Sequence, residues 1–62
     1  MFLEKLNAAI DSSGYKRKAL ADKLGIRYDT FRRKLNGENQ FKIAELLSLC
    51  KILNISILDL FK

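Results

Sequence analysis

Three glycines and a complete lack of proline determine how this chain can be divided. Gly14, Gly25 and Gly37 stand 11 and 12 residues apart, and no proline interrupts the segments between them. Glycine readily takes the left-handed conformation that ends a helix. Between the glycines, apolar residues recur every three or four positions, which is the period of one face of a helix. No segment alternates apolar and polar residues for long enough to indicate a strand, so the pattern predicts an all-α fold.

The apolar spacing predicts five helices joined by short connections. We expect three helices that end at or near the three glycines, and two more over roughly 43–53 and 56–61. Ser56 is a favourable N-cap for the fifth helix, and Asp59, three residues on, completes a capping box. The residues most clearly expected in the core are Leu20, Leu24, Phe31, Leu47 and Leu53.

The composition excludes several classes of function. The chain has 62 residues, of which 48% are apolar, so we expect a single domain over 1–62 with a compact core. No apolar run approaches the roughly 18 residues of a membrane span, and no signal peptide is recognisable, which favours a cytoplasmic protein. Cys50 is the only cysteine and there is no histidine. The usual zinc and haem ligands and an imidazole base are therefore missing, so we expect no metal, cofactor, small-molecule ligand or enzymatic activity, and a buried, apolar role for Cys50.

The positive charge is concentrated in the middle of the chain. The net charge is +5 at pH 7. Nine basic and three acidic residues lie between Tyr15 and Lys42, so this stretch carries +6 and the remainder carries −1. Such a concentration is typical of a surface that binds a polyanion. A basic face that only keeps the protein in solution is the alternative on charge alone.

The stretch over 17–38, RKALADKLGIRYDTFRRKLNGE, meets the steric requirements of a helix-turn-helix. Two helices that cross closely need a small residue at the crossing, here Ala21, and a turn residue that tolerates positive φ, here Gly25. Ile26, directly after the turn, and Phe31, one turn into the second helix, can lock the angle between the helices. The spacings of these four residues agree with one another.

This stretch resembles the helix-turn-helix family of lambda-type phage repressors and Cro proteins, also called the XRE family. LNGEN resembles the Asn-Gly loop of the family, and LLSLCKILNISILDLF resembles its fourth and fifth helices, so the resemblance covers roughly 15–61. LNG followed by Phe41 is similar to regulators of phages and mobile elements in low-GC bacteria. The resemblance implies a compact five-helix DNA-binding domain, with the helix-turn-helix formed by helices 2 and 3, in a bacterial or phage-infected cytoplasm.

Two residues depart from the pattern of the family. The first position of helix 2 is usually glutamine, which braces a phosphate and the recognition helix, and here it is Arg17. The recognition helix usually carries an apolar residue where this chain has Lys34, so we expect Leu35 to provide the packing instead. Lys34, like Lys18 and Lys23, is expected to supply diffuse charge or solubility.

The resemblance implies that the start and outer face of helix 3 enter the major groove of DNA. Arg33 is then placed to bind guanine, and Asp29 could accept a hydrogen bond from cytosine, orient Arg33 or repel wrong sites. Tyr28 could touch a thymine methyl group or pack inward. The expected base-reading residues are Tyr28, Asp29, Thr30, Arg32 and Arg33. The expected phosphate-binding residues are Lys16, Arg17, Arg27, Asn36, Asn39, Gln40 and Lys42.

The helix boundaries that the resemblance implies place cations at the N-cap positions of helices 2, 3 and 4. Lys16, Arg27 and Lys42 are poor caps, since Ser, Thr, Asp or Asn there would each be worth about 1 kcal/mol. In folds of this type these three helix starts face DNA. Our hypothesis is that bound phosphates satisfy the free amide groups, with a cation beside each; chance in a basic sequence is the alternative.

A single recognition helix reads only a few base pairs, so we expect a weak homodimer on near-palindromic half-sites about 34 Å apart. The apolar residues expected to form its interface are Ile57, Leu58 and Phe61. The expected function is a regulator of transcription on double-stranded operator DNA, a repressor rather than an activator because occupying a promoter is enough to block it. An antirepressor or adaptor that keeps the fold and binds an acidic protein is the second reading, and the folded-core pattern disfavours a membrane-active peptide.

Overall fold

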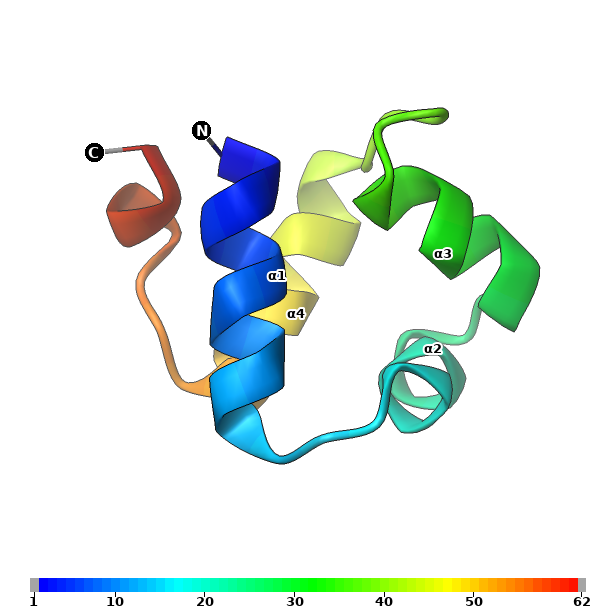
Figure 1. The fold of residues 1–62 in the computed structure, drawn as a ribbon, viewed down its shortest axis with the longest axis horizontal. Coiled ribbons are helices and arrows are strands. Elements are labelled where there is room, and N and C mark those ends of the chain that lie inside the picture. Colours follow the sequence, from blue (N-terminus) through cyan, green and yellow to red (C-terminus); the bar gives the residue numbers. More distant parts are fainter. Residues whose placement is uncertain (1, 62) are drawn as a thin grey trace.

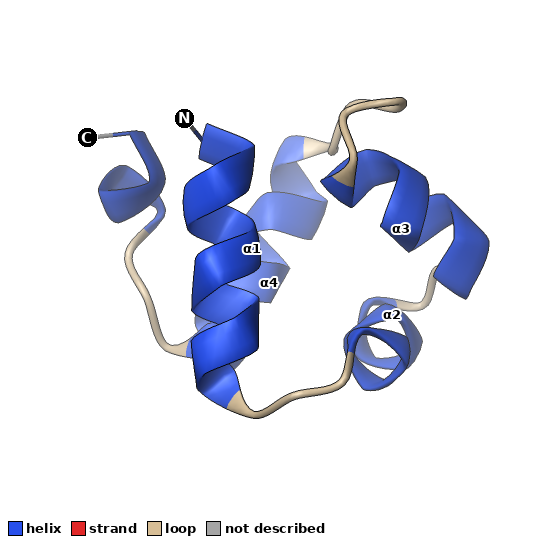
Figure 2. Cartoon of the chain, viewed as in Figure 1, coloured by secondary structure: helices blue, strands red, loops and turns tan. Residues whose placement is uncertain are grey.

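The computed structural model describes residues 2–61, which form four α-helices followed by one short 3-10 helix (Figure 1). The elements are α1 (Phe2–Ser13), α2 (Arg17–Leu24), α3 (Tyr28–Leu35), α4 (Ile43–Leu53) and η1 (Ile57–Phe61). Within this described range there is no strand, and short loops join the helices (Figure 2). The predicted all-α fold is therefore confirmed.

The ends of α2 and α4 share one backbone arrangement. Gly25 has φ 74°, and the amide of Ile26 beyond it donates to the carbonyl of Ala21 at 3.0 Å. Asn54 has φ 58° after α4, and the amide of Ile55 donates to the carbonyl of Cys50 at 3.0 Å. This is the hydrogen bond that closes a helix when the next residue is left-handed. Gly25 was predicted in this role, and Asn54 is the residue next best suited to it after glycine.

The fifth predicted helix is a 3-10 helix, so the prediction of five α-helices is wrong in this element. Ser56 does cap it, because its Oγ accepts a hydrogen bond from the amide of Leu58 at 3.3 Å. The amide of Asp59 donates to the carbonyl of Ser56 at 3.0 Å, which is the tighter i to i+3 pattern. A segment of five residues is too short to gain from the α-helical pattern, and short end segments commonly take the 3-10 form.

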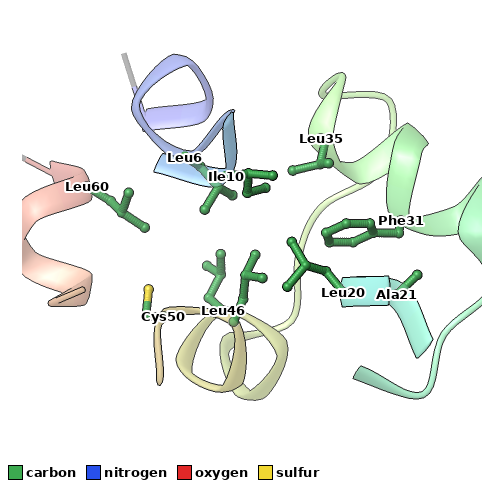
Figure 3. Close-up of a cluster of buried hydrophobic side chains, with 10 residues drawn as sticks. Leu6, Ile10, Leu20, Ala21, Phe31, Leu35, Leu46, Cys50 and Leu60 are labelled. Carbon is green, nitrogen blue, oxygen red and sulfur yellow. The ribbon is translucent and has the colours of Figure 1, made fainter. Parts of the chain in front are cut away.

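The core lies where α1 and α4 cross, with η1 on one side and α2 and α3 on the other (Figure 1). Phe31 is fully buried and points from α3 toward Leu20 of α2, while Leu46 and Cys50 reach into the cluster from α4 (Figure 3). The buried apolar side chains are Leu6, Ile10, Leu20, Ala21, Phe31, Leu35, Leu46, Leu49, Cys50 and Leu60. All five elements contribute side chains to this one cluster.

Most of the predicted core is confirmed, with one error. Leu20 and Phe31 are fully buried, and two more of the predicted set, Leu24 and Leu53, pack partly buried against the cluster. Leu47 was expected inside but is 50% exposed. The helix α4 is apolar on more than one side, and the face it turns inward carries Leu46, Leu49 and Cys50, which leaves the neighbouring Leu47 outside.

Cys50 is buried, as expected, and is only 4% exposed. Because burial disfavours the thiolate, it raises the pKa of the Cys50 thiol above its ordinary value.

Among the helices described here, none is long and apolar enough to cross a membrane. The described residues also contain no group of three or more His, Cys, Asp or Glu side chains that could hold a metal ion.

Candidate nucleic-acid interface

The helix-turn-helix is formed by α2 and α3, which pack directly on each other. Ala21 is fully buried at this contact, so the small side chain allows the helices to approach closely. Gly25 makes the turn, and Ile26 and Phe31 follow it, with Ile26 partly buried and Phe31 completely so. Each of the four steric requirements inferred from the sequence is thus met by the predicted residue.

The outer face of α3 carries most of the predicted base-reading residues. Asp29, Arg32 and Arg33 are exposed, and Thr30 is partly buried. Tyr28 is 43% exposed, which disfavours the alternative that it packs inward. No ion pair within residues 2–61 joins Asp29 to Arg33, so both charged groups are available to a ligand. The opposite face of α3 is buried, and the helix is therefore fixed with its basic side outward.

The three cations expected at helix starts do occupy N-cap positions. Lys16, Arg27 and Lys42 precede α2, α3 and α4, and each has extended backbone angles with ψ between 144° and 149°. Within the described chain, none of these three side chains bonds to an amide of the helix it precedes. A lysine or arginine has no acceptor with which to do so. The amide groups in the first turns of α2 and α3 are therefore left to solvent or to a bound anion.

A buried ion pair that the sequence analysis missed joins α3 to α4. The Nζ of Lys34 donates to Oε1 of Glu45, and the same oxygen accepts a hydrogen bond from the amide of Lys42 at 2.9 Å. The side chains of Lys34 and Glu45 are only 9% and 14% exposed. We call these three residues the α3–α4 clasp. Lys34, expected to supply diffuse charge at the surface, is instead buried because Glu45 provides a partner inside.

The pKa of Glu45 reflects this arrangement. Burial alone raises the pKa of the carboxyl group, but the hydrogen bonds from Lys34 and from the amide of Lys42, together with both positive charges, outweigh burial and lower it overall. Glu45 is therefore held as a carboxylate inside the protein. The available signal was its position three residues after Lys42, where a glutamate reaches back to the amide before the helix.

The loop between α3 and α4 presents three of the predicted phosphate-binding residues. Asn36, Asn39 and Gln40 are exposed. Phe41 holds the end of the loop, since its ring meets the ring of Phe31 edge to face at 6.2 Å between centroids. Leu35, at the end of α3, is buried as expected in the place of an apolar residue at position 34. The loop is thus anchored at both ends, with its polar side chains outward.

Arg17 is turned toward α1 in the free protein. Its Nη1 donates to Oδ1 of Asp11 and its Nη2 donates to Oδ1 of Asn7, both at 2.9 Å. The Nδ2 of Asn7 donates in turn to the carbonyls of Leu3 at 3.0 Å and of Leu35 at 3.3 Å. Asn7 was not among the predicted site residues, and nothing in its local sequence indicates that it links the start of α2 to the end of α3.

The predicted dimer residues differ in how free they are. Leu58 and Phe61 are 69% and 62% exposed, whereas Ile57 is partly buried against the core. The ring of Phe61 stacks on that of Phe2 with 5.1 Å between centroids. An open, mainly apolar pocket of about 320 Å³ lies between the start of α1, the α3–α4 loop and Phe61. Of the three residues, Leu58 is the most exposed, and within residues 2–61 it does not pack against the core.

The family assignment follows from the sequence as a whole. Residues 5–62 match the model of the Cro/C1-type HTH DNA-binding domain. No curated protein and no solved structure shows significant similarity to the chain. The family model spans nearly the full sequence, and the helix-turn-helix of α2 and α3 has the geometry described above. The chain therefore belongs to the Cro/C1-type family of helix-turn-helix DNA-binding domains.

Proposed function

We propose that the protein is a sequence-specific transcriptional regulator, a Cro-like repressor that binds near-palindromic operator DNA as a dimer through the major groove. The observation that carries the proposal is the arrangement of α3. Its outer face presents Asp29, Arg32 and Arg33 to solvent, while Phe31 fixes the inner face in the core. A rigid helix with a charged, outward face is the element that such domains place in the groove.

The base-reading role falls mainly to the two arginines. A guanidinium can donate two hydrogen bonds to N7 and O6 of guanine, which distinguishes a G·C pair in the major groove. Arg33 lies one helical turn beyond Asp29, so the pair spans neighbouring bases, with Asp29 accepting from cytosine N4. Tyr28 and Thr30 complete the surface at the start of the helix.

The phosphate contacts surround this helix. The cation-capped starts of α2 and α3 leave backbone amides for phosphate oxygens, and Lys16 and Arg27 supply a positive charge beside each. Asn36, Asn39 and Gln40 extend the polar rim along the α3–α4 loop, and Lys42 continues it to the start of α4. Contacts of this kind fix the register of the protein on DNA without reading its sequence.

Dimerisation is assigned to η1. The elements α3 and η1 lie at opposite ends of the molecule (Figure 1). A contact between two copies through Leu58 and Phe61 therefore leaves both recognition helices free. The exposed apolar area is small, which favours a weak dimer that forms fully on DNA. A pair of such domains blocks transcription by occupying a promoter.

Selection of binding sites from random duplex DNA tests the proposal. We expect enrichment of a short motif repeated with dyad symmetry, at a half-site spacing of about 34 Å, or one helical turn. As a control, the variant Arg33→Ala should lose enrichment at one position of each half-site, whereas Lys23→Ala, an exposed lysine outside the proposed contacts, should select the same motif. Binding to all duplexes with equal affinity would contradict the proposal, and so would a lack of binding.

A further inference from the structure

The contact between Arg17 and Asp11 lies at the edge of the proposed DNA surface. Arg17 is the first residue of α2, directly after the cation Lys16. Its side chain is 33% exposed and that of Asp11 is 67% exposed, so solvent reaches this ion pair. The pair therefore differs from the buried Lys34–Glu45 pair, which is closed off from any ligand.

The two hydrogen bonds of Arg17 have different surroundings. Asp11 is an exposed side chain, and its bond to Arg17 is the contact that holds its carboxylate within the described structure. Asn7 is partly buried, and its own amide group is anchored to the carbonyls of Leu3 and Leu35. The bond from Arg17 to Asn7 therefore holds the guanidinium in place when its bond to Asp11 breaks.

A carboxylate and a phosphate are interchangeable partners for a guanidinium. Both offer anionic oxygen atoms, and both accept charge-assisted hydrogen bonds from the same N–H groups. A solvent-exposed pair contributes little to stability, so an incoming phosphate can displace Asp11 at small cost. While Asp11 stays in place, its negative charge also repels a phosphate that approaches the start of α2.

We propose, on the basis of the function proposed above, that Asp11 competes with DNA phosphates for Arg17. Asp11 binds the guanidinium in the free protein, and this bond breaks only when the other contacts bring a phosphate close. Displacement of Asp11 costs the same free energy on every duplex whose phosphate Arg17 binds, so the competition lowers the affinity for each of them by about the same factor. Asp11 thus reduces the overall affinity of the protein for DNA without touching a base.

The variant Asp11→Asn tests this, with Asp22→Asn as the matched control. Both remove one negative charge, and Asp22 is an exposed residue of α2. We expect Asp11→Asn to raise the affinity for a random-sequence duplex about two- to fivefold, with an unchanged thermal midpoint, and Asp22→Asn to raise it less. The conservative variant Asp11→Glu keeps the charge and should bind as the wild type does.

A double variant shows whether the effect passes through Arg17. In an Arg17→Gln background, the change Asp11→Asn should raise affinity no more than Asp22→Asn does. The proposal is overturned if Asp11→Asn equals Asp22→Asn in the wild-type background, or if its larger gain persists without Arg17. If the wild type and every variant fail to bind any duplex, the proposed function is rejected, and this inference is rejected with it. Selective binding by the wild type with equal effects of the two asparagine variants rejects this inference alone.

Discussion

Lys34 of α3 and Glu45 of α4 form an ion pair that links the two helices, and less than a sixth of either side chain is exposed. The lysine is buried, whereas Arg32 and Arg33 on the same helix are exposed. Its charge is therefore balanced inside the protein and not by a ligand. The same Glu45 oxygen also bonds to the amide of Lys42, so one carboxylate fixes both the end of α3 and the start of α4.

Removal of one partner of this pair should destabilise the fold strongly. Glu45→Gln leaves the Lys34 ammonium buried without an anion, and we expect a loss of about 3 kcal/mol in the free energy of unfolding. The double variant Lys34→Met with Glu45→Leu removes both charges. Its free energy of unfolding should lie within about 1 kcal/mol of the wild-type value, or above it. Urea unfolding followed by circular dichroism measures both.

The control for this experiment is Glu38→Gln. Glu38 is an exposed acid of the α3–α4 loop, so its neutralisation changes the net charge equally without touching the pair. We expect little change in its unfolding midpoint. Equal losses for Glu45→Gln and Glu38→Gln would mean that net charge, and not the clasp, controls stability.

Stability should fall in acid because of Glu45. Although burial raises the pKa of this carboxyl, its hydrogen bonds and the nearby cations lower the pKa in the folded protein below the ordinary value of 4.5. The unfolded chain then binds the proton more readily, so this contribution is complete above pH 4.5 and is lost as the pH falls through the folded value. Thermal midpoints measured from neutral pH down into the acid range should drop more for the wild type than for the double variant Lys34→Met with Glu45→Leu, which lacks the charged pair.

Better caps should trade DNA binding for stability. Replacing Lys16, Arg27 and Lys42 together with serine should raise the free energy of unfolding by about 1 kcal/mol for each cap. DNA binding should weaken, with a salt slope shallower by about one unit for each cation lost from a phosphate. A matched variant with Lys18, Lys23 and Lys51 changed to serine loses the same charge at positions inside helices, and none of them is an N-cap. Its thermal midpoint should not rise. Equal affinities of the two variants for DNA would reject the hypothesis that phosphates bind at the helix starts.

Base and phosphate contacts should respond differently to alanine. Arg33→Ala should cost about 1–3 kcal/mol on the selected site and relax the preference at one base pair. Lys42→Ala should weaken all duplexes alike and lower the salt slope by about one unit. Titrations of each variant against matched and mismatched duplexes at several salt concentrations separate the two. A uniform loss for Arg33→Ala would place that residue on the backbone of the DNA.

The dimer is tested most cleanly at Leu58. Leu58→Lys changes a side chain that is 69% exposed, so the monomer should fold normally. We expect it to bind a single half-site as the wild type does but to lose the added affinity of the dyad site. Leu47→Lys is the control, because Leu47 is an apolar side chain of α4 that is 50% exposed and outside η1. Sedimentation at increasing protein concentration shows the state of each variant free of DNA.

The sequence predicted the helix boundaries well because their signals are local. A glycine with positive φ acts within one turn, and Gly25 ends α2 where the pattern indicated; the N-cap position of Arg27 came instead from the helix boundaries of the family. The helix-turn-helix followed for the same reason, since its four steric requirements lie within a few residues of one another. The family match over residues 5–62 agrees with that reading.

The errors concern residues whose environment depends on distant parts of the chain. Lys34 looked like a surface cation because its partner lies 11 residues away on another helix. Leu47 looked like core because an apolar helix offers more than one face, and only the packing of α1, α2 and η1 against α4 decides which one is buried. Arg17 and Asn7 meet across 10 residues, and their bond depends on the angle between α1 and α2. Spacing along one helix contains none of this information.

The burial of Cys50 determines what chemical labelling or oxidation of its thiol measures. A cysteine that is 4% exposed, with its thiol pKa raised by burial, is both inaccessible and largely protonated at neutral pH. A thiol reagent reaches it only when α4 separates from the core, so the rate of labelling measures how often the folded chain opens. Air oxidation likewise cannot link two folded copies through this residue. A covalent dimer on a non-reducing gel would therefore come from unfolded molecules, and association of the native protein is necessarily non-covalent.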